Sequence, residues 1–268
     1  MQTFARLVTH ADFTVDAVTC CGDHGGWSEA ESPRDYRMVL VRSGRFRRRT
    51  RSGAAEVDRL SAYLGIPGEP EHFAHPDGGD VCTAITIGHS LWHAIAGDEV
   101  HAVAPTVCID ARLDLEHRLL VADAADGDID FACAERLSGL VSAAVRQIVA
   151  TSVPAAGGSR DCALVAAARA LLHDDHPAAA GLLPLAAELS VSPYRLSRAF
   201  TQETGVSLTK YRNRLRVSRA MDSLERQDTG LAELAADLGF ADQAHLTRTV
   251  RAHLGHTPTA VKALLRTA

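Results

Sequence analysis

The feature that most constrains this chain is a helical pattern that occurs twice near the C-terminus, about 50 residues apart. Residues 183–203 predict a short helix, a tight turn and a second helix, and residues 231–253 repeat that order. Ser192 before Pro193 marks the start of the second helix in the first copy, and Asp242 marks it in the second, because short polar side chains cap free helix amides. Two short helices joined in this way predict a helix-turn-helix unit.

Each copy has an apolar inner face that predicts how its helices pack. Its members are Leu185, Ala186, Leu189, Leu196 and Phe200 in the first copy and Leu234, Ala235, Leu238, Leu246 and Val250 in the second. Val191 and Phe240 follow the turns and are expected to fill the angle between the helices. Gly239 suits the left-handed turn residue of the second copy.

The outer face of the second helix in each copy predicts contact with DNA, because this helix normally lies in the major groove. Arginine can bind guanine through two hydrogen bonds, and glutamine can bind adenine in the same way. The candidate DNA-binding residues are Tyr194, Arg195, Ser197, Arg198, Gln243, Ala244, Thr247, Arg248 and Arg251. For each arginine the alternative is a salt bridge on a solvent-exposed helix.

A long helix is predicted over residues 207–227, between the two copies. Ser207 caps it, and core contacts are expected from Leu208, Tyr211, Leu215, Ala220 and Leu224. Twenty helical residues measure roughly 30 Å, close to one DNA turn of about 34 Å. Such a rod could hold the two reading helices in successive major grooves. The helix carries four arginines that either meet phosphates or face solvent: Arg212, Arg214, Arg216 and Arg219.

The strings LSRAFTQETGVSLTKYRNRLRVSRA and LAADLGFADQAHLTRTVRAHLGHTP, within residues 161–265, resemble the AraC/XylS family of bacterial transcription regulators. In that family two helix-turn-helix units joined by a central helix form the DNA-binding domain. The resemblance implies base contacts from Tyr194, Ser197, Arg198, Gln243, Ala244 and Arg248, and phosphate contacts from Thr247 and Arg251. The family usually has glycine where this chain has Ser190, so the resemblance implies modest strain in the first turn. Ala244 offers no polar group to a base, so we expect less selectivity from the second unit.

Charge is distributed unequally along the chain. The net charge is −5 overall, −7 over residues 1–160 and +2 over residues 161–268. Because phosphate binding depends on local basic patches, the acidic total does not exclude DNA binding. The Pro/Gly/Ser-rich residues within 151–160 predict a linker between an N-terminal domain at 1–150 and a DNA-binding domain at 161–268.

The N-terminal domain is predicted to be mainly β-structure followed by helices. Between about Val15 and Val107, runs such as MVLVRSGRF, LSAYLGIPGEP and VCTAITIG predict strands of an antiparallel barrel or sandwich. From Asp114 to Val149 the pattern is helical, with an apolar stripe that packs on its own domain or on a second subunit. The stripe consists of Leu137, Leu140, Val141, Val145, Ile148 and Val149.

The family resemblance implies a cupin-like β-barrel here, with flanking helices, a small-molecule effector and a homodimer. The predicted fold class is therefore α+β with two domains: a cupin-like antiparallel barrel with flanking helices, then an all-α domain with two helix-turn-helix motifs. Dimerisation is expected through residues 130–150.

Candidate effector-binding residues come from three short segments: Trp27, Arg45, Arg47, His72 and His75. Trp27, in the stretch His24-Gly25-Gly26-Trp27, either lines a pocket or closes the end of the barrel. In a strand, Arg45, Arg47, Arg49 and Arg51 share one face, and Phe46 and Arg48 share the other. This arginine run is either an anion-binding or DNA-facing patch or, as the favoured interpretation, a solvated edge strand protected against aggregation.

Side chains that bind soft metals also occur in this half: Cys20, Cys21, His24, His72, His75, Cys82, His89 and His93. They allow a thiol or metal sensor as an alternative to a small-molecule sensor. Structural thiols and surface histidines are the favoured interpretation, with no metal or cofactor expected. The six cysteines show no CxxC pair.

A cupin-type metalloenzyme is the competing class of function. Enzymatic cupins usually show a His-x-His pair with a later glutamate, whereas this chain has His72-x-x-His75.

No stretch approaches the roughly 20 apolar residues of a membrane span, and the N-terminus lacks a signal-peptide layout. The sequence predicts a cytoplasmic, non-enzymatic transcription regulator that binds double-stranded DNA, with RNA polymerase as a possible further partner.

Overall fold

The fold was examined in a computed structural model, which describes residues 2–22, 25–97, 106–126, 129–150, 159–226 and 229–267. The chain divides into two compact units, one made of residues 1–152 with 220–268 and the other of residues 153–219. None of the helices in the described ranges is long and apolar enough to cross a membrane.

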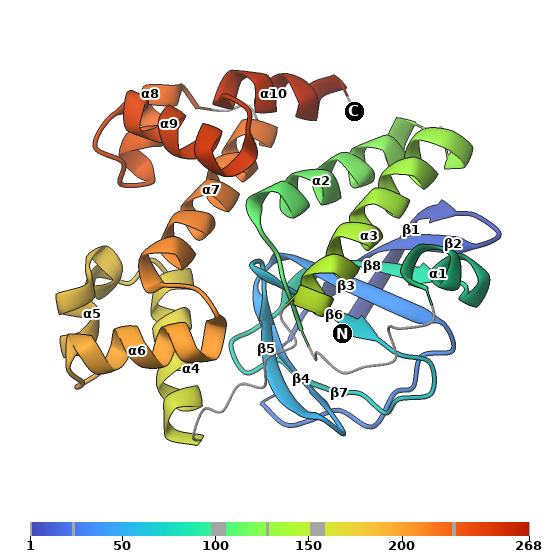
Figure 1. The fold of residues 1–268 in the computed structure, drawn as a ribbon, viewed down its shortest axis with the longest axis horizontal. Helices are drawn as coiled ribbons and strands as arrows, with labels where there is room; N and C mark the ends of the chain where they lie inside the picture. The colour runs from blue at the N-terminus through green and yellow to red at the C-terminus, as the bar shows by residue number, and fades with distance from the viewer. Residues whose placement is uncertain are drawn as a thin grey trace. The chain divides into compact units, whose positions relative to one another are not determined.

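Two antiparallel sheets form the β-structure of the first unit (Figure 1). The larger has the strand order β1-β2-β8-β3-β6-β9, and the smaller has the order β5-β4-β7. The strands are β1 (Gln2–Thr9), β2 (Phe13–Cys20), β3 (Tyr36–Ser43), β4 (Arg45–Thr50), β5 (Gly53–Asp58), β6 (Ser61–Gly65), β7 (His72–Ala74), β8 (Asp80–Ile87) and β9 (Val107–Cys108). The predicted strand runs are therefore confirmed. The prediction missed β1, whose side chains are mostly exposed and show no apolar alternation.

The larger sheet is buried on both faces, because neighbouring side chains of a strand point to opposite sides. Met38, Leu40 and Ile85 belong to a core that includes residues of the helices. Val39 and Cys82 belong to a second core shared with the smaller sheet. This double burial explains the uninterrupted apolar run MVLV in β3.

Helices α2 (Ala111–Asp126) and α3 (Ala134–Ala150) lie across one face of the larger sheet (Figure 1). A π-helical turn, Ile129–Cys133, precedes α3. The predicted helical region is thus confirmed, whereas α1 (His89–Ala96) was predicted neither as helix nor as strand. Its Trp92 stacks on Tyr36 of β3 at 4.4 Å between ring centroids, which fastens α1 to the sheet.

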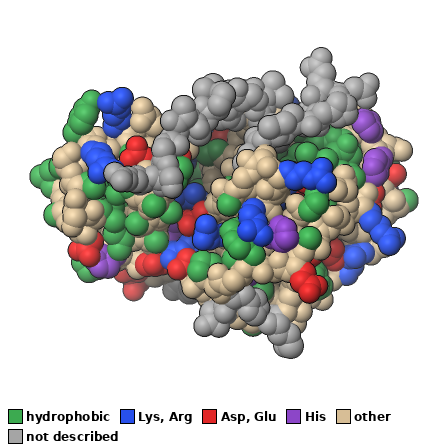
Figure 2. Space-filling model, turned by 90° about the horizontal axis from the view of Figure 1, so that it is seen from below, with side chains coloured by type: hydrophobic (Ala, Val, Ile, Leu, Met, Phe, Trp, Pro, Cys, Tyr) green, Lys and Arg blue, Asp and Glu red, His purple; other side chains and the backbone are tan. Residues whose placement is uncertain are grey.

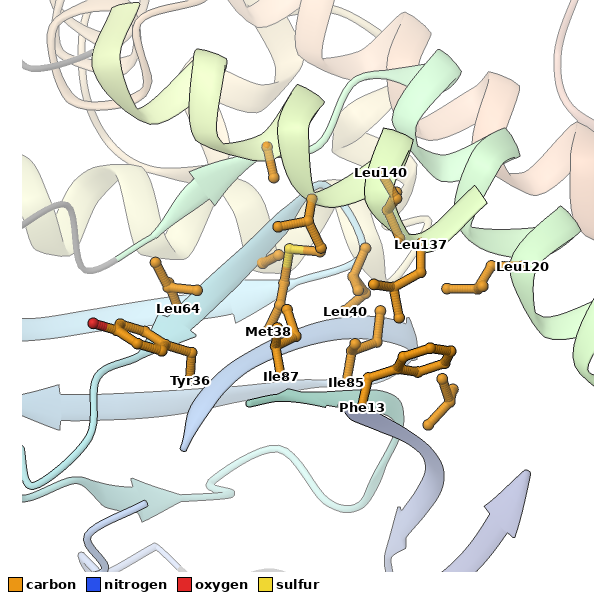
Figure 3. Close-up of a cluster of buried hydrophobic side chains, with 14 of the residues drawn as sticks. Phe13, Tyr36, Met38, Leu40, Leu64, Ile85, Ile87, Leu120, Leu137 and Leu140 are labelled. Carbon is orange, nitrogen blue, oxygen red and sulfur yellow. The ribbon is translucent and has the colours of Figure 1, made fainter. Parts of the chain in front are cut away.

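The apolar stripe of α3 is used within its own domain. Leu137 and Leu140 point from α3 toward Met38 and Leu40 of β3 (Figure 3). Four members of the stripe are buried: Leu137, Leu140, Val141 and Val145. The side chains of Ile148 and Val149 lie outside the described set. Of the two alternatives for this stripe, packing on its own domain is confirmed; a homodimer through residues 130–150 stays a prediction and needs other surfaces.

The rest of the described chain is helical, as predicted. Its helices are α4 (Ser159–His173), a 3₁₀ turn (Pro177–Ala180), α5 (Leu182–Glu188), α6 (Pro193–Thr204), α7 (Leu208–Arg226), α8 (Leu231–Asp237), α9 (Gln243–Leu254) and α10 (Pro258–Thr267). Residues 151–158 of the predicted linker lie outside the described residues. Its last two positions begin α4, so the linker prediction extended too far.

An ion-pair cluster joins α2 to the end of α7 within the first unit. Arg118, which is 3% exposed, donates to Asp114 Oδ1 at 3.0 Å, Asp222 Oδ1 at 2.7 Å and Glu225 Oε2 at 2.6 Å. Arg59 donates to Asp222 Oδ2 at 2.6 Å. Burial alone would raise the pKa of the Asp222 carboxyl, but the positive charges of Arg118 and Arg59 outweigh it and lower that pKa. Helix α2 also contacts α9 and α10. Residues 220–268 therefore belong to the same compact unit as residues 1–152, whereas the sequence predicted a division at residues 151–160.

Candidate functional site

The two helix pairs, α5–α6 and α8–α9, share the same turn geometry. Ser190 and Gly239 both have left-handed backbone, with φ of +54° and +67°. In each turn one amide donates to a carbonyl three residues back, and the next donates five residues back. These bonds are Ser190 N to Ala187 O at 3.0 Å, Val191 N to Ala186 O at 3.0 Å, Gly239 N to Ala236 O at 2.9 Å and Phe240 N to Ala235 O at 2.8 Å. The expected departure at Ser190 is confirmed: a residue with a Cβ atom occupies a conformation that favours glycine.

Helices α6 and α9 also begin and end in the same way. Ser192 Oγ accepts a hydrogen bond from the Arg195 amide at 3.2 Å, and Asp242 Oδ1 accepts one from the His245 amide at 2.6 Å. These are the predicted N-caps, which satisfy amides that the helix itself leaves free. Both helices end at a glycine with left-handed backbone, Gly205 in one and Gly255 in the other.

The predicted inner faces are confirmed by burial except at Leu189 and Leu238, which are half-buried. Leu196 and Phe200 of α6 and Leu246 and Val250 of α9 are fully buried. Phe240 is buried after the second turn, as expected, whereas Val191 is only half-buried after the first. Each helix pair is thus fixed by its own small core, which leaves the opposite side of α6 and α9 to solvent.

Most predicted DNA-binding side chains lie on that outer side. Tyr194 is 74% exposed, an unusual state for an aromatic ring. The other exposed members are Arg195, Arg198, Gln243, Ala244, Arg248 and Arg251. Ser197 and Thr247 are half-buried. Exposed, uncommitted polar side chains on a rigid helix are what recognition of base edges and phosphates requires.

The arginines of these faces differ in their partners. Arg195 lies 3.3 Å from Asp161 of α4, the surface salt bridge that sequence reasoning held as the alternative to a DNA contact. Among the described residues, Arg198 and Arg248 form no ion pair, so their guanidinium groups are free to bind a ligand. On the face that Figure 2 shows, basic side chains are spread among acidic and neutral ones.

Helix α7 is folded largely as predicted, but not all of its arginines face solvent. Arg219 donates to the carbonyls of Leu172 and His173 at the end of α4, at 3.2 and 2.8 Å, and also contacts Asp175. Arg216 is buried. At least these two arginines therefore have structural roles, and the solvated-face interpretation is wrong for them.

A cavity of about 420 Å³ lies between the two sheets of the first unit. This volume is within the range of small-molecule sites, roughly 300–1,000 Å³. Five aromatic rings line it: Phe4, Trp27, Phe46, Tyr63 and Phe73. Its polar and sulfur-containing members are Gln2, Cys20, Ser28, Glu31, Arg37, His75, Asp80 and Cys82.

Two of the five predicted effector residues, Trp27 and His75, line this cavity. Arg45 is paired with Asp77 at 2.9 Å. Arg47 lies against the ring of Trp27, with 5.2 Å from its guanidinium carbon to the ring centroid. The last predicted residue is His72, whose Nδ1 lies 2.9 Å from the Ser28 carbonyl oxygen. These last three lie outside the cavity lining.

The arginine run of β4 was interpreted incorrectly as an edge strand. Strand β4 is the middle strand of its sheet, between β5 and β7. The alternation is as predicted, but Arg48 is buried and donates to Glu71 Oε1 at 2.6 Å. Arg37 donates to the other oxygen of Glu71 at 2.5 Å. A buried carboxylate on a loop, which compensates both charges, gives no periodic signal in the sequence.

The structure brings together part of the soft-ligand set. Ligand atoms of Cys20, His75 and Asp80 all lie within 4.8 Å of one another. Cys82 donates to Asp80 Oδ2 at 2.8 Å. Burial raises the pKa of the Cys82 thiol, and the Asp80 charge raises it further. Other members of the set lie apart: Cys21 is exposed, His89 pairs with Asp35, and His24 is outside the described residues.

Sequence reasoning missed Asp80, which lies at the centre of this group. One signal was present, because Asp80 and Cys82 are two positions apart at the start of a strand and must share a face. Cys20 pairs with Asp80 across β2 and β8. The pairing itself depends on strand register, which the sequence does not state.

Comparison with known proteins identifies the C-terminal helices. Residues 185–263 match the family model described as a helix-turn-helix domain. The HTH-type transcriptional activator RhaS of Escherichia fergusonii is 30% identical over 93 residues, which cover 35% of this chain and 34% of that protein. The arabinose operon regulatory protein of Escherichia coli is 30% identical over 79 residues, which cover 30% of this chain and 27% of that protein. Residues 185–263 therefore form a helix-turn-helix domain.

This helix-turn-helix domain is the part of the chain that these similarities concern. The match to RhaS spans about a third of the length of that relative. Among solved structures, ToxT from Vibrio cholerae covers 97% of this chain and is itself covered completely, with a TM-score of 0.38 and 12% identity. A cupin 2 conserved barrel domain protein from Leptotrichia buccalis covers 32% of this chain and is covered to 41%, with a TM-score of 0.29 and 10% identity. TM-scores this low do not define a shared fold.

Proposed function

We propose that this protein is a sequence-specific DNA-binding regulator of transcription, controlled by a small-molecule effector in its N-terminal cavity. In this proposal the regulatory part is residues 1–150, and the DNA-binding part is residues 161–268. The observation that carries the proposal is the repetition, in α5–α6 and α8–α9, of one turn, one N-cap and one exposed polar helix face.

The exposed faces of α6 and α9 support a role in base recognition. Arg198 and Arg248 project from helices whose inner faces are fully buried, so their backbones are held rigidly. A bidentate arginine–guanine contact contributes roughly 1–3 kcal/mol of discrimination between bases. Tyr194 and Gln243, which are also exposed, would add contacts next to the arginines.

The test is binding of the purified full-length protein to the DNA upstream of its own gene and to random duplex. We expect a clear preference for the upstream DNA and a steep loss of affinity as salt rises, because bound phosphates release counterions. Equal affinity for both DNAs would refute sequence-specific regulation. Selection from a random DNA pool then gives the operator.

Alanine variants of Arg198 and Arg248 locate the contacts. If the arginine reads a base, its replacement by alanine should lower specific affinity by roughly 5- to 150-fold and relax the preference at one base pair. If the arginine binds a phosphate, its replacement should weaken binding to all DNA sequences equally and reduce the salt slope by about 1. Arg34→Ala removes the same charge from an exposed position of the N-terminal domain and serves as the control. If Arg34→Ala weakens binding as much as Arg198→Ala, the assignment of α6 is wrong.

The cavity between the sheets supports the effector part of the proposal. Its lining combines aromatic rings with polar groups that could orient a ligand, and both are features of small-molecule sites. Ala84→Phe places a ring in this space, because Ala84 of β8 lines the cavity. The variant should lose the effector response and keep its basal DNA affinity. A normal response would exclude this cavity as the effector site.

A further inference from the structure

We infer that Cys20, His75 and Asp80 form a binding site for a divalent metal ion of the zinc class, at one wall of the N-terminal cavity. The three side chains come from the end of β2, the residue after β7 and the start of β8. Cys20 precedes His75 by 55 positions in the chain, so only the fold brings it next to His75 and Asp80. The inference deepens the effector part of the proposed function.

The spacing of the ligand atoms suits a small metal ion. In a tetrahedral zinc site, bond lengths near 2.0–2.3 Å place neighbouring ligand atoms roughly 3.3–3.8 Å apart. The Sγ, imidazole and carboxylate atoms here lie within 4.8 Å of one another. Side-chain shifts of about 1 Å would complete the coordination. A thiolate with an imidazole selects zinc or cobalt over magnesium or calcium, which prefer oxygen ligands.

One carboxylate oxygen of Asp80 lies beside the His75 ring nitrogen. This Oδ1 atom is buried and receives no hydrogen bond from the described residues. It lies 2.9 Å from His75 Nε2, an ion-pair distance when the imidazole is protonated. Leaving a buried carboxylate oxygen without a hydrogen bond is costly. A cation shared by the two atoms would remove that cost.

The surroundings hold the ligands in place. The Cys82 thiol donates to the other carboxylate oxygen of Asp80, which leaves Oδ1 for the metal. The ring of Phe46 packs 5.7 Å from the His75 ring between centroids. A Cβ atom on Gly79 would lie 2.1 Å from the Cys20 carbonyl oxygen, so glycine is required for β2 to approach the start of β8 this closely. Such supporting contacts are typical of built metal sites.

Metal binding has defined chemistry here. Cys20 would bind as the thiolate and release its proton to water, because the thiolate is the form that ligates metals. Three protein ligands leave one coordination position, as in open zinc sites. All three ligands line the cavity, so that position is available to water or to a donor atom of an effector.

The test is a cobalt titration of the reduced, chelator-treated full-length protein, followed by displacement with zinc. We expect one cobalt ion per chain, a thiolate-to-cobalt charge-transfer absorption and intense visible bands of tetrahedral cobalt. Cys20→Ala should abolish the charge-transfer band. His75→Gln and Asp80→Asn should weaken binding by at least about 10- to 100-fold. The three variants differ in burial and chemistry, and circular dichroism selects those that fold.

Cys21→Ser and Cys162→Ser are matched controls, since both thiols are exposed and outside the cluster. They should bind cobalt like the wild type. Absence of stoichiometric binding, or an unchanged charge-transfer band in folded Cys20→Ala, overturns the inference. In a second test, the reduced protein is exposed to air in the presence of zinc and analysed by mass spectrometry. A disulfide between Cys20 and Cys82 in place of bound metal also overturns the inference. The titration contains no DNA, so its failure leaves the proposed DNA recognition untouched, and failure of DNA recognition leaves the metal site untouched.

Discussion

Replacing Ser190 with glycine should stabilise the protein, although it removes atoms from the chain. Ser190 has φ of +54° in the turn between α5 and α6. The left-handed conformation costs a residue with a Cβ atom roughly 1–2 kcal/mol. Glycine avoids that cost but loses roughly 0.4–1 kcal/mol through the greater freedom of the unfolded chain. The net expectation is a gain of about 0.5–1 kcal/mol.

No compensating contact is lost in this substitution. The Ser190 side chain is exposed, and the turn hydrogen bond to Ala187 uses its backbone amide. Gly239 at the equivalent place, with φ of +67°, shows that glycine fits the same turn. The reverse change, Gly239→Ser, should therefore destabilise the second helix-turn-helix by about 1 kcal/mol.

The assay is urea unfolding of the full-length protein, followed by the helical circular dichroism signal, together with a thermal melt. Ser190→Gly should raise the urea midpoint without changing the slope and raise Tm by about 2 °C. Ser190→Ala is the matched control, because it removes the hydroxyl but keeps the Cβ atom, and should leave stability within about 0.5 kcal/mol of wild type. If Ser190→Gly is no more stable than Ser190→Ala, the strain argument is refuted.

Three further perturbations test the first unit. Arg118→Met should cost about 3 kcal/mol in urea unfolding, because it removes a buried cation that Asp114, Asp222 and Glu225 share, whereas Arg6→Met, from a pair with a half-exposed arginine, should cost under about 1 kcal/mol. Burial lowers the pKa of His117 well below its ordinary value, and the charges of Arg42 and Arg118 lower it further. The unfolded chain therefore takes up a proton first as pH falls below about 6.5, and stability should drop by up to about 1.4 kcal/mol per pH unit; His117→Leu should remove this component, and an unchanged pH profile would contradict it. Gly79→Ala should destabilise the protein and weaken cobalt binding together, since its Cβ atom would lie 2.1 Å from a backbone oxygen; normal values of both would contradict the close approach of β2 and β8.

The helix-turn-helix units were predictable from the sequence in detail. Their signals are local: a cap such as Ser192, a left-handed turn residue such as Gly239, and apolar side chains at helical spacing. Each signal acts over fewer than about five residues, so the sequence alone places the helices and their exposed faces. The strain at Ser190 was also predictable, because the family that the sequence resembles usually has glycine there.

The N-terminal site depended on tertiary structure. Strand runs were recognisable, but strand order was not, and β4 proved to be a central strand whose Arg48 is buried against Glu71. The cavity and its Cys20–His75–Asp80 group depend on the register of β2 with β8 and on a loop that returns His75 to the same point. Such long-range pairing is determined by the packing of whole sheets, and no local pattern encodes it. The sequence by itself therefore determined the helices proposed to read DNA, and only the folded structure decided which side chains meet in the proposed effector cavity.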